Sequence, residues 1–170
     1  MTLGEARVSD GSSKQPPATA EENTSQTKTG EHMARALQDY QKARFGPVQT
    51  NYLTIFRDRL QNALGSDDAP PLDVAKNEVE LFSEQIEKLK SRMFDETIRA
   101  MGHWFDLAEK VGARSEIETL LKQSIEQFCQ GIGSDALKLA ESYADLLKNA
   151  DAAWRQKYPE RVARLTKSSV

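Results

Sequence analysis

Few side chains in this sequence could do chemistry. The 170 residues include only two histidines, His32 and His103, and one cysteine, Cys129. His103 has acidic neighbours on a predicted helix, which could suit a metal ion, but no second histidine or cysteine stands at ligand spacing. Cys129 lies among apolar helical residues, as is typical of a packed thiol rather than a nucleophile. We therefore predict no metal site and no cofactor.

Two further patterns resemble functional motifs but lack their context. Gly131-Ile132-Gly133 has neither the preceding strand nor the third glycine of a dinucleotide fingerprint. Carboxylate pairs such as Glu84 and Glu87 alternate with lysine and arginine, as on a solvated helix surface. No Ser–His–acid or Cys–His arrangement can be built from the two histidines. We expect no catalytic residues and no enzymatic activity.

Basic residues gather near the carboxyl end, at Arg155, Lys157, Arg161, Arg164 and Lys167. Such a cluster could dock a nucleic acid or an acidic partner, or it could complement the dipole at the end of a helix. The formal net charge of −3 gives no general attraction to nucleic acids or anionic membranes. We expect no nucleic-acid partner.

The elements around these residues are all predicted to be helical, and the chain divides into four segments. Residues 1–30 are polar and predict a disordered tail. Residues 31–65 predict a helical segment interrupted at Gly46-Pro47, residues 73–157 a helical hairpin, and residues 158–170 a frayed, basic tail. No secretory signal and no run of about 20 apolar residues is present. With the single cysteine, these features predict a cytoplasmic protein without a transmembrane segment.

The hairpin is predicted from two long apolar stripes. Asp73 is the expected N-cap of the first helix, and Phe94, Ile98 and Phe105 form a second stripe beside the main one. The main stripe has heptad-like spacing with one stutter and comprises Val79, Phe82, Ile86, Leu89, Met93, Thr97, Met101, Trp104, Ala108 and Val111.

A short turn separates this helix from the last one. Gly112 is expected to adopt the left-handed conformation that closes a helix, and Ser115 with Glu118 to form a capping box that opens the next. A kink or break is expected at Gly131 and Gly133, followed by capping at Ser134. The stripe of the last helix comprises Ile117, Leu121, Ile125, Phe128, Ile132, Ala136, Leu139, Tyr143, Leu146, Ala150 and Ala153.

The predicted fold is therefore all-α: a long antiparallel, amphipathic, coiled-coil-like hairpin with additional N-terminal helices and a disordered N-terminal tail. A lone hairpin would leave a large apolar patch exposed, and such patches mark interaction sites. Three covers are possible: the N-terminal helices fold back over the patch, other copies of the chain pack on it, or it lies on another surface.

The segment from about Asp73 to Trp154 resembles the phasin family, helical proteins that coat polyhydroxyalkanoate granules in bacteria. The likeness rests on Leu107 to Val111 with the turn at residues 112–115, on Gln123 eight residues after Ser115, and on residues 139–148 (LAESYADLLK). It covers about half of the chain. An aromatic residue common in phasins three positions after the glutamine is replaced here by Glu126.

The resemblance implies an interfacial role at the surface of polyhydroxyalkanoate granules in the cytoplasm, controlling their size and dispersion. Off the granule, the same face would pair with other copies as a homo-oligomer, and granule-associated proteins are further possible partners. The alternative is a coiled-coil adaptor that binds one protein partner through the same stripe. The expected contact residues are Phe94, Ile98, Met101, Trp104, Phe105, Ile125, Phe128, Ile132, Leu139, Tyr143 and Leu146.

Overall fold

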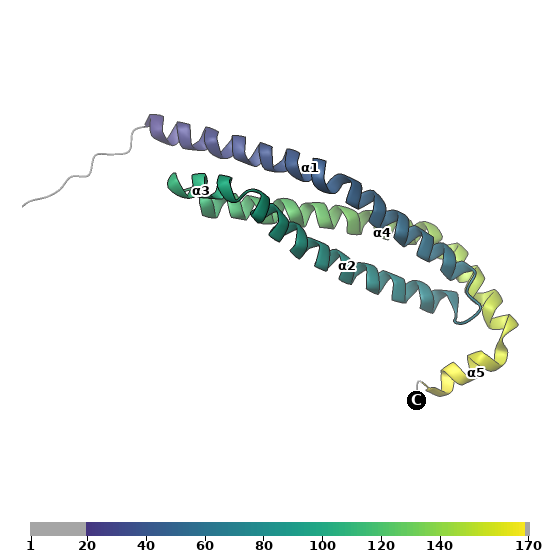
Figure 1. Cartoon of the computed structure of the whole chain (residues 1–170). Coiled ribbons are helices and arrows are strands. Elements are labelled where there is room, and N and C mark those ends of the chain that lie inside the picture. The colour runs from purple at the N-terminus through teal and green to yellow at the C-terminus, as the bar shows by residue number, and fades with distance from the viewer. Residues whose placement is uncertain (1–19, 169–170) are drawn as a thin grey trace, which may run out of the picture.

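The structure, a computed structural model, describes residues 20–168, with side chains described for residue 28 and residues 30–167. Within this range the chain is all-helical, as predicted. The helices are α1 (Ala20–Leu64), α2 (Pro71–Ala100), α3 (Gly102–Lys110), α4 (Arg114–Lys157) and α5 (Pro159–Ser168). α1, α2 and α4 run alongside one another, α3 lies at one tip, and α5 projects from the other end (Figure 1).

The three long helices alternate in direction. Leu72, near the start of α2, contacts Asp151 near the end of α4, whereas Lys90, later in α2, contacts Glu126, earlier in α4. α2 and α4 are therefore antiparallel. α1 is connected to α2 by a short loop and runs parallel to α4, so the described chain forms an up-down-up bundle.

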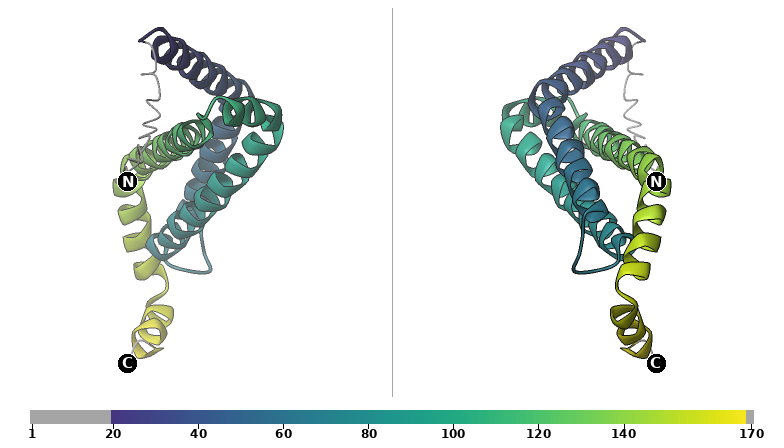
Figure 2. Two further views of the ribbon diagram at one scale, coloured as in Figure 1. Left: turned by 90° about the vertical axis from the view of Figure 1, so that its left-hand side faces the viewer. Right: turned by 90° about the vertical axis from the view of Figure 1, so that its right-hand side faces the viewer.

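α1 is longer than the sequence predicted at both places where we expected a boundary. It begins at Ala20, so residues 20–30 are helical rather than part of a disordered tail, while the prediction for residues 1–19 lies outside the described residues. It also continues through Gly46-Pro47, with Pro47 inside the helix. Proline removes one helical hydrogen bond and bends a helix without necessarily ending it. Figure 2 shows α1 changing direction between its purple and blue parts.

The second helical segment differs from its prediction at both ends. α2 begins with Pro71 in its first turn, a position that suits proline, and Asp73 lies in that first turn instead of capping it. The expected continuous helix is interrupted at Met101, after which α3 starts. The interruption coincides with the stutter in the stripe. Just before it, the Thr97 hydroxyl donates to the Met93 carbonyl oxygen at 2.7 Å, a bond that tends to bend helices.

The turn before α4 confirms one prediction and contradicts another. Gly112 has a φ of 73°, so the predicted left-handed glycine is confirmed. The predicted capping box is wrong, because Ala113 is the N-cap and makes no side-chain cap hydrogen bond. Arg114 instead forms ion pairs with Glu109 and Glu118, at 3.0 and 3.2 Å, and these tie α3 to the start of α4.

α4 is continuous where a break was expected. It passes through Gly131 and Gly133 without interruption and ends at Lys157, with Tyr158 as its C-cap before Pro159, as predicted. Each glycine costs about 1 kcal/mol relative to alanine, and burial of Ile132 between them favours the intact helix. The C-terminal segment, expected to fray, forms α5.

The core lies between α1, α2 and α4, with a contribution from α3. α1 thus provides the first of the three expected covers, folding back over the apolar stripes of α2 and α4. Side chains from all of these helices make one cluster, which includes Met33, Leu37, Phe45, Phe56, Leu60, Phe82, Leu89, Met93, Phe105, Ile117, Leu121, Ile125 and Ile132.

Candidate surface-binding face

The residues predicted to contact an external surface fall into three groups. Met101, Phe105, Ile125 and Ile132 are buried. Phe94, Ile98, Phe128, Leu139 and Tyr143 are partly buried and pack against the core. Trp104 and Leu146 are exposed, with exposed fractions of 43% and 55%.

In the closed bundle these residues do not form one exposed face. Nine of the eleven are covered or partly covered because the three long helices pack their apolar stripes together. Leu146 does not belong to the buried face of α4. At this end of the helix, the buried residues are Leu147, Asp151 and Trp154. Contact between an external surface and most of these residues requires a helix to move away.

The N-terminal arm of α1, which we define as residues 20–46, leaves a pocket along its contact with α4. The pocket has a volume of about 180 Å³ and is lined by Leu37 and Gln38 of the arm and by Ile117, Gln123 and Ser124 of α4, among others. Gln38 and Gln123 are exposed, so the pocket opens to solvent at the edge of the contact.

A buried glutamine in the same arm is only half satisfied. Gln41 is 5% exposed, and its Oε1 accepts a hydrogen bond from the Ser124 hydroxyl. Its Nε2 finds no partner among the described residues. A buried donor without an acceptor costs about 1–3 kcal/mol, so this contact favours separation of the arm from α4 relative to an apolar pair.

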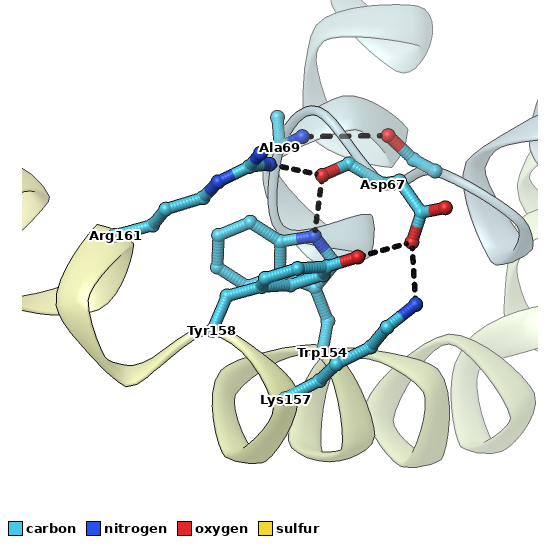
Figure 3. A network of polar contacts seen from close by, with 7 residues as sticks. Asp67, Ala69, Trp154, Lys157, Tyr158 and Arg161 are labelled. Carbon is cyan, nitrogen blue, oxygen red and sulfur yellow. Dashed lines mark hydrogen bonds and ion pairs between the residues drawn. The ribbon is translucent and has the colours of Figure 1, made fainter.

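The opposite end of the bundle is held by a polar clasp centred on Asp67 in the α1–α2 loop. The Asp67 carboxylate accepts hydrogen bonds from Lys157 Nζ at 3.1 Å and from the Tyr158 hydroxyl at 3.0 Å. Its backbone carbonyl accepts from Trp154 Nε1 at 3.2 Å and from the Arg161 guanidinium. Figure 3 shows these four side chains converging on the loop from α4 and α5.

The clasp has a clear electrostatic signature. Hydrogen bonds from Lys157 and Tyr158, reinforced by the charge of Lys157, lower the pKa of the Asp67 carboxyl. The clasp also gives part of the C-terminal basic cluster a structural role, since Lys157 and Arg161 bind this loop. A third member, Arg155, pairs with Asp151 at 2.6 Å.

Asp151 makes a second tie at the same end. It is 5% exposed and accepts a hydrogen bond from the backbone N–H of Leu72 at 3.2 Å while it pairs with Arg155. The N–H that it satisfies belongs to the first turn of α2, where no intrahelical acceptor exists. A buried carboxylate thus joins the start of α2 to the end of α4.

An exposed apolar stripe marks the tip of the bundle. Trp104, Leu107 and Val111 are exposed and recur at spacings of three and four, which places them on one face of α3 and its C-cap. Phe105 and Ala108, on the other face, are buried. Trp104 was predicted as a contact residue, but Leu107 was not. The i, i+3, i+7 spacing of Trp104, Leu107 and Val111 could have identified Leu107 as well.

The two histidines and the cysteine do not form a recognisable site among the described residues. His32 and His103 are exposed, and no three His, Cys, Asp or Glu side chains among those described are grouped to hold a metal ion. Cys129 is buried, and this burial raises the pKa of its thiol, as expected of a packed cysteine. Sequence analysis missed Gln41 and Asp67, because their roles depend on contacts with residues more than 80 positions away.

Comparisons with known proteins returned nothing: no family model matches the chain, and no curated protein or solved structure matches it. Among helices within residues 20–168, none is both long and apolar enough to cross a membrane.

Proposed function

We propose that this protein is a non-enzymatic, phasin-like coat protein that covers a hydrophobic particle, such as a polyhydroxyalkanoate granule, and controls its size and dispersion. The observation that carries the proposal is the half-satisfied Gln41, which is buried between the N-terminal arm and α4 at the end opposite the clasp. When the arm moves away, apolar side chains of α3 and α4 become available to a surface.

The free energy of such an opening is compatible with surface binding. Apolar area removed from water contributes roughly 25 cal/mol per Å², whether the cover is α1 or a polyester. Exchanging one apolar cover for the other is therefore close to neutral. The unsatisfied Gln41 Nε2 then favours the exchange, because it can donate a hydrogen bond to water once the arm has moved.

The position of Pro47 supports a defined hinge. Proline has already removed one hydrogen bond from α1 at this point, so a change of direction there breaks fewer bonds than elsewhere in the helix. After the hinge, α1 is anchored by buried side chains: Phe56 lies against Phe82 with ring centroids 4.6 Å apart, and Leu60 is fully buried. Opening thus affects residues 20–46 and leaves residues 48–64 in place.

The exposed stripe of Trp104, Leu107 and Val111 provides the first contact in this proposal. It is available without any opening, and tryptophan is well suited to an apolar–water boundary. Once it is attached, the tip would hold Ile117 and Leu121 of α4, which follow directly in sequence, close to the particle. The charged outer faces of the helices would remain in water and keep coated particles apart.

The test is co-sedimentation of the full chain with polyhydroxybutyrate particles, polystyrene beads and anionic liposomes. We expect saturable binding to the polyester and to polystyrene, but not to the liposomes. Trp104→Glu with Leu107→Glu should weaken binding at the tip, whereas Asn149→Glu with Gln156→Glu, an equal charge change at exposed polar positions of α4, should not. Phe105 is not used in place of Leu107, because a buried glutamate there would unfold the core. A loss of binding would then not separate loss of the surface contact from loss of the fold.

The requirement for opening is tested with a chemical lock. In a Cys129→Ala background, Gln41→Cys and Ser124→Cys place two thiols at facing positions, which a short bismaleimide can join. The locked protein should lose most of its binding to polyester, whereas the same variant with blocked, unjoined thiols should retain it. Absence of binding to both hydrophobic surfaces by the unmodified chain would contradict the proposal and favour the adaptor alternative, in which a single protein partner binds with fixed stoichiometry.

A further inference from the structure

A second apolar surface lies between α2 and α4 and remains open in the closed bundle. It is a groove of about 400 Å³. Val79 and Phe82 line it from α2, Gly133 and Ala140 line it from α4, and α1 contributes Phe56. Of the described residues that line this groove, only Ser83 and Glu87 have polar side chains, which distinguishes the groove from the clasped end.

A large apolar side chain stands on the rim of the groove. Leu137 is 61% exposed, the most exposed large apolar side chain among the described residues. It lies four residues after Gly133 and three before Ala140, so all three share one face of α4. A Cβ added at Gly133 would meet no atom within 4 Å. A protruding leucine is thus bordered by the small residues that could receive another leucine.

We propose that a second copy of this chain occupies the groove, with Leu137 of each copy inserted beside Gly133 and Ala140 of the other. An isologous two-fold contact requires one surface to be complementary to itself. A knob flanked by its own matching hollow satisfies that requirement in shape, provided that the two α4 helices cross antiparallel at Leu137.

The charges along α4 agree with this register. Glu126 lies eleven residues before Leu137, and Lys148 lies eleven residues after it. Eleven residues are close to three full turns, so these side chains lie on the face that carries Leu137. In an antiparallel crossing centred on Leu137, Glu126 of each copy is opposite Lys148 of the other. Both are more than half exposed, and their pairs within the chain, with Lys90 and Asp145, are 3.4 and 3.7 Å long.

This contact is independent of the proposed particle-binding face. The particle-binding face is uncovered only when the N-terminal arm leaves α4, whereas the groove is accessible with the arm in place. A dimer formed through Leu137 therefore does not require opening, and it leaves the tip stripe at Trp104 free. The dimer contact also differs from the pairing expected from the sequence, which used the face that α1 now covers.

Sedimentation velocity of the full chain over a wide concentration series tests the proposal without any particle. The unmodified chain should form a dimer, and Leu137→Asp should weaken the dimer by about 30-fold, the loss typical of a central interface residue. A monomer at every concentration, or an oligomer that Leu137→Asp leaves unchanged, would overturn the proposal. Neither result would bear on particle binding, which is measured separately by co-sedimentation.

A pair of glycine variants separates loss of the interface from loss of the fold. Gly133→Leu should raise the melting temperature, because the site is open and glycine is a poor helix former, and yet it should abolish the dimer by filling the hollow. Gly131→Leu is the matched control: a Cβ there also meets nothing within 4 Å, but the residue does not line the groove. It should raise the melting temperature and leave the dimer intact. Equal dimerisation of the two variants would contradict the proposed contact.

Charge reversal tests the register. Glu126→Lys and Lys148→Glu should each weaken the dimer by a few-fold, about the value of an exposed ion pair, and the double variant should recover the original affinity. Failure of the double variant to recover would rule out the antiparallel register centred on Leu137.

Discussion

The two ends of the bundle are built from different interactions. At one end, the α1–α2 loop is joined to α4 and α5 by the Asp67 clasp and by Asp151, and Leu60 and Ala63 of α1 are fully buried. At the other end, the N-terminal arm meets α4 with the half-satisfied Gln41 buried in the contact. One helix, α1, belongs to both ends.

The difference indicates where a closed helical bundle can open. Polar groups with several matched partners hold a specific geometry, whereas a polar group buried with too few partners destabilises the contact that buries it. Pro47 lies between the N-terminal arm and the part of α1 that belongs to the clasped end. We therefore propose that the closed bundle opens at the end that carries Gln41.

The largest difference between the ends should appear on truncating buried leucines. Leu60→Ala should destabilise the bundle by about 3 kcal/mol, because a fully buried leucine is replaced by a cavity. Leu37→Ala should cost about half as much, because Leu37 borders a pocket that is open to solvent, so water can enter the space that the truncation leaves. Urea unfolding monitored by circular dichroism gives both values, and equal losses would remove the distinction between the ends.

A smaller loss of stability is expected when the buried carboxylate of Asp151, which joins α2 to α4, is removed. Asp151→Ala leaves the Leu72 N–H without its acceptor and Arg155 without its partner, and it should cost about 2 kcal/mol. Arg155→Ala, which leaves Asp151 bonded to Leu72, should cost less. If Arg155→Ala were the more harmful change, the surface ion pair rather than the link between α2 and α4 would hold this end.

Removing the unsatisfied polar contact at Gln41 should make the two ends of the bundle more alike. Gln41→Leu with Ser124→Ala replaces both polar partners by apolar groups, and it should stabilise the bundle by about 1 kcal/mol. Ser124→Ala alone should destabilise it, because Gln41 then loses its one hydrogen bond from α4. The double variant should also bind polyester more slowly in a stopped-flow experiment, since opening of the arm becomes less favourable.

The smallest expected effect is the response of the clasp to acid. The pKa of Asp67 is lowered in the folded chain, so its contribution is complete above the ordinary aspartate value of about 3.9 and is lost as the pH falls through the folded pKa. Fluorescence of Trp154 in a Trp104→Phe background should report this loosening at acidic pH. Asp67→Asn should remove the transition, and a transition that persists in Asp67→Asn would assign it to another carboxyl group.

Helix type and the apolar stripes could be predicted from the sequence because both depend on local spacing. The stripe from Phe82 to Thr97 is buried as expected, and Gly112 closes its helix. Boundaries were harder to predict at residues whose local preference competes with packing. Pro47, Gly131 and Gly133 predict breaks, yet burial of Phe45 and Ile132 beside them favours continuous helices.

The candidate site was the less predictable part. The stripes indicated which side chains need a cover, but the spacing alone could not decide between α1, a second copy and a particle. That choice depends on how residues 31–64 pack on α4, a contact between distant segments. For the same reason, the clasp and the Gln41 defect could not be recognised before the helices were placed side by side.

Distances between spin labels on the two ends would test the central claim, opening at the arm alone, most directly. In the Cys129→Ala background, one labelled pair is Arg35→Cys with Thr119→Cys across the end that carries Gln41, and the other is Asn62→Cys with Ala152→Cys across the clasped end; all four sites are exposed. On addition of polyhydroxybutyrate particles, the first distance should lengthen and the second should stay unchanged. Two unchanged distances on bound protein, or lengthening of both, would contradict the account.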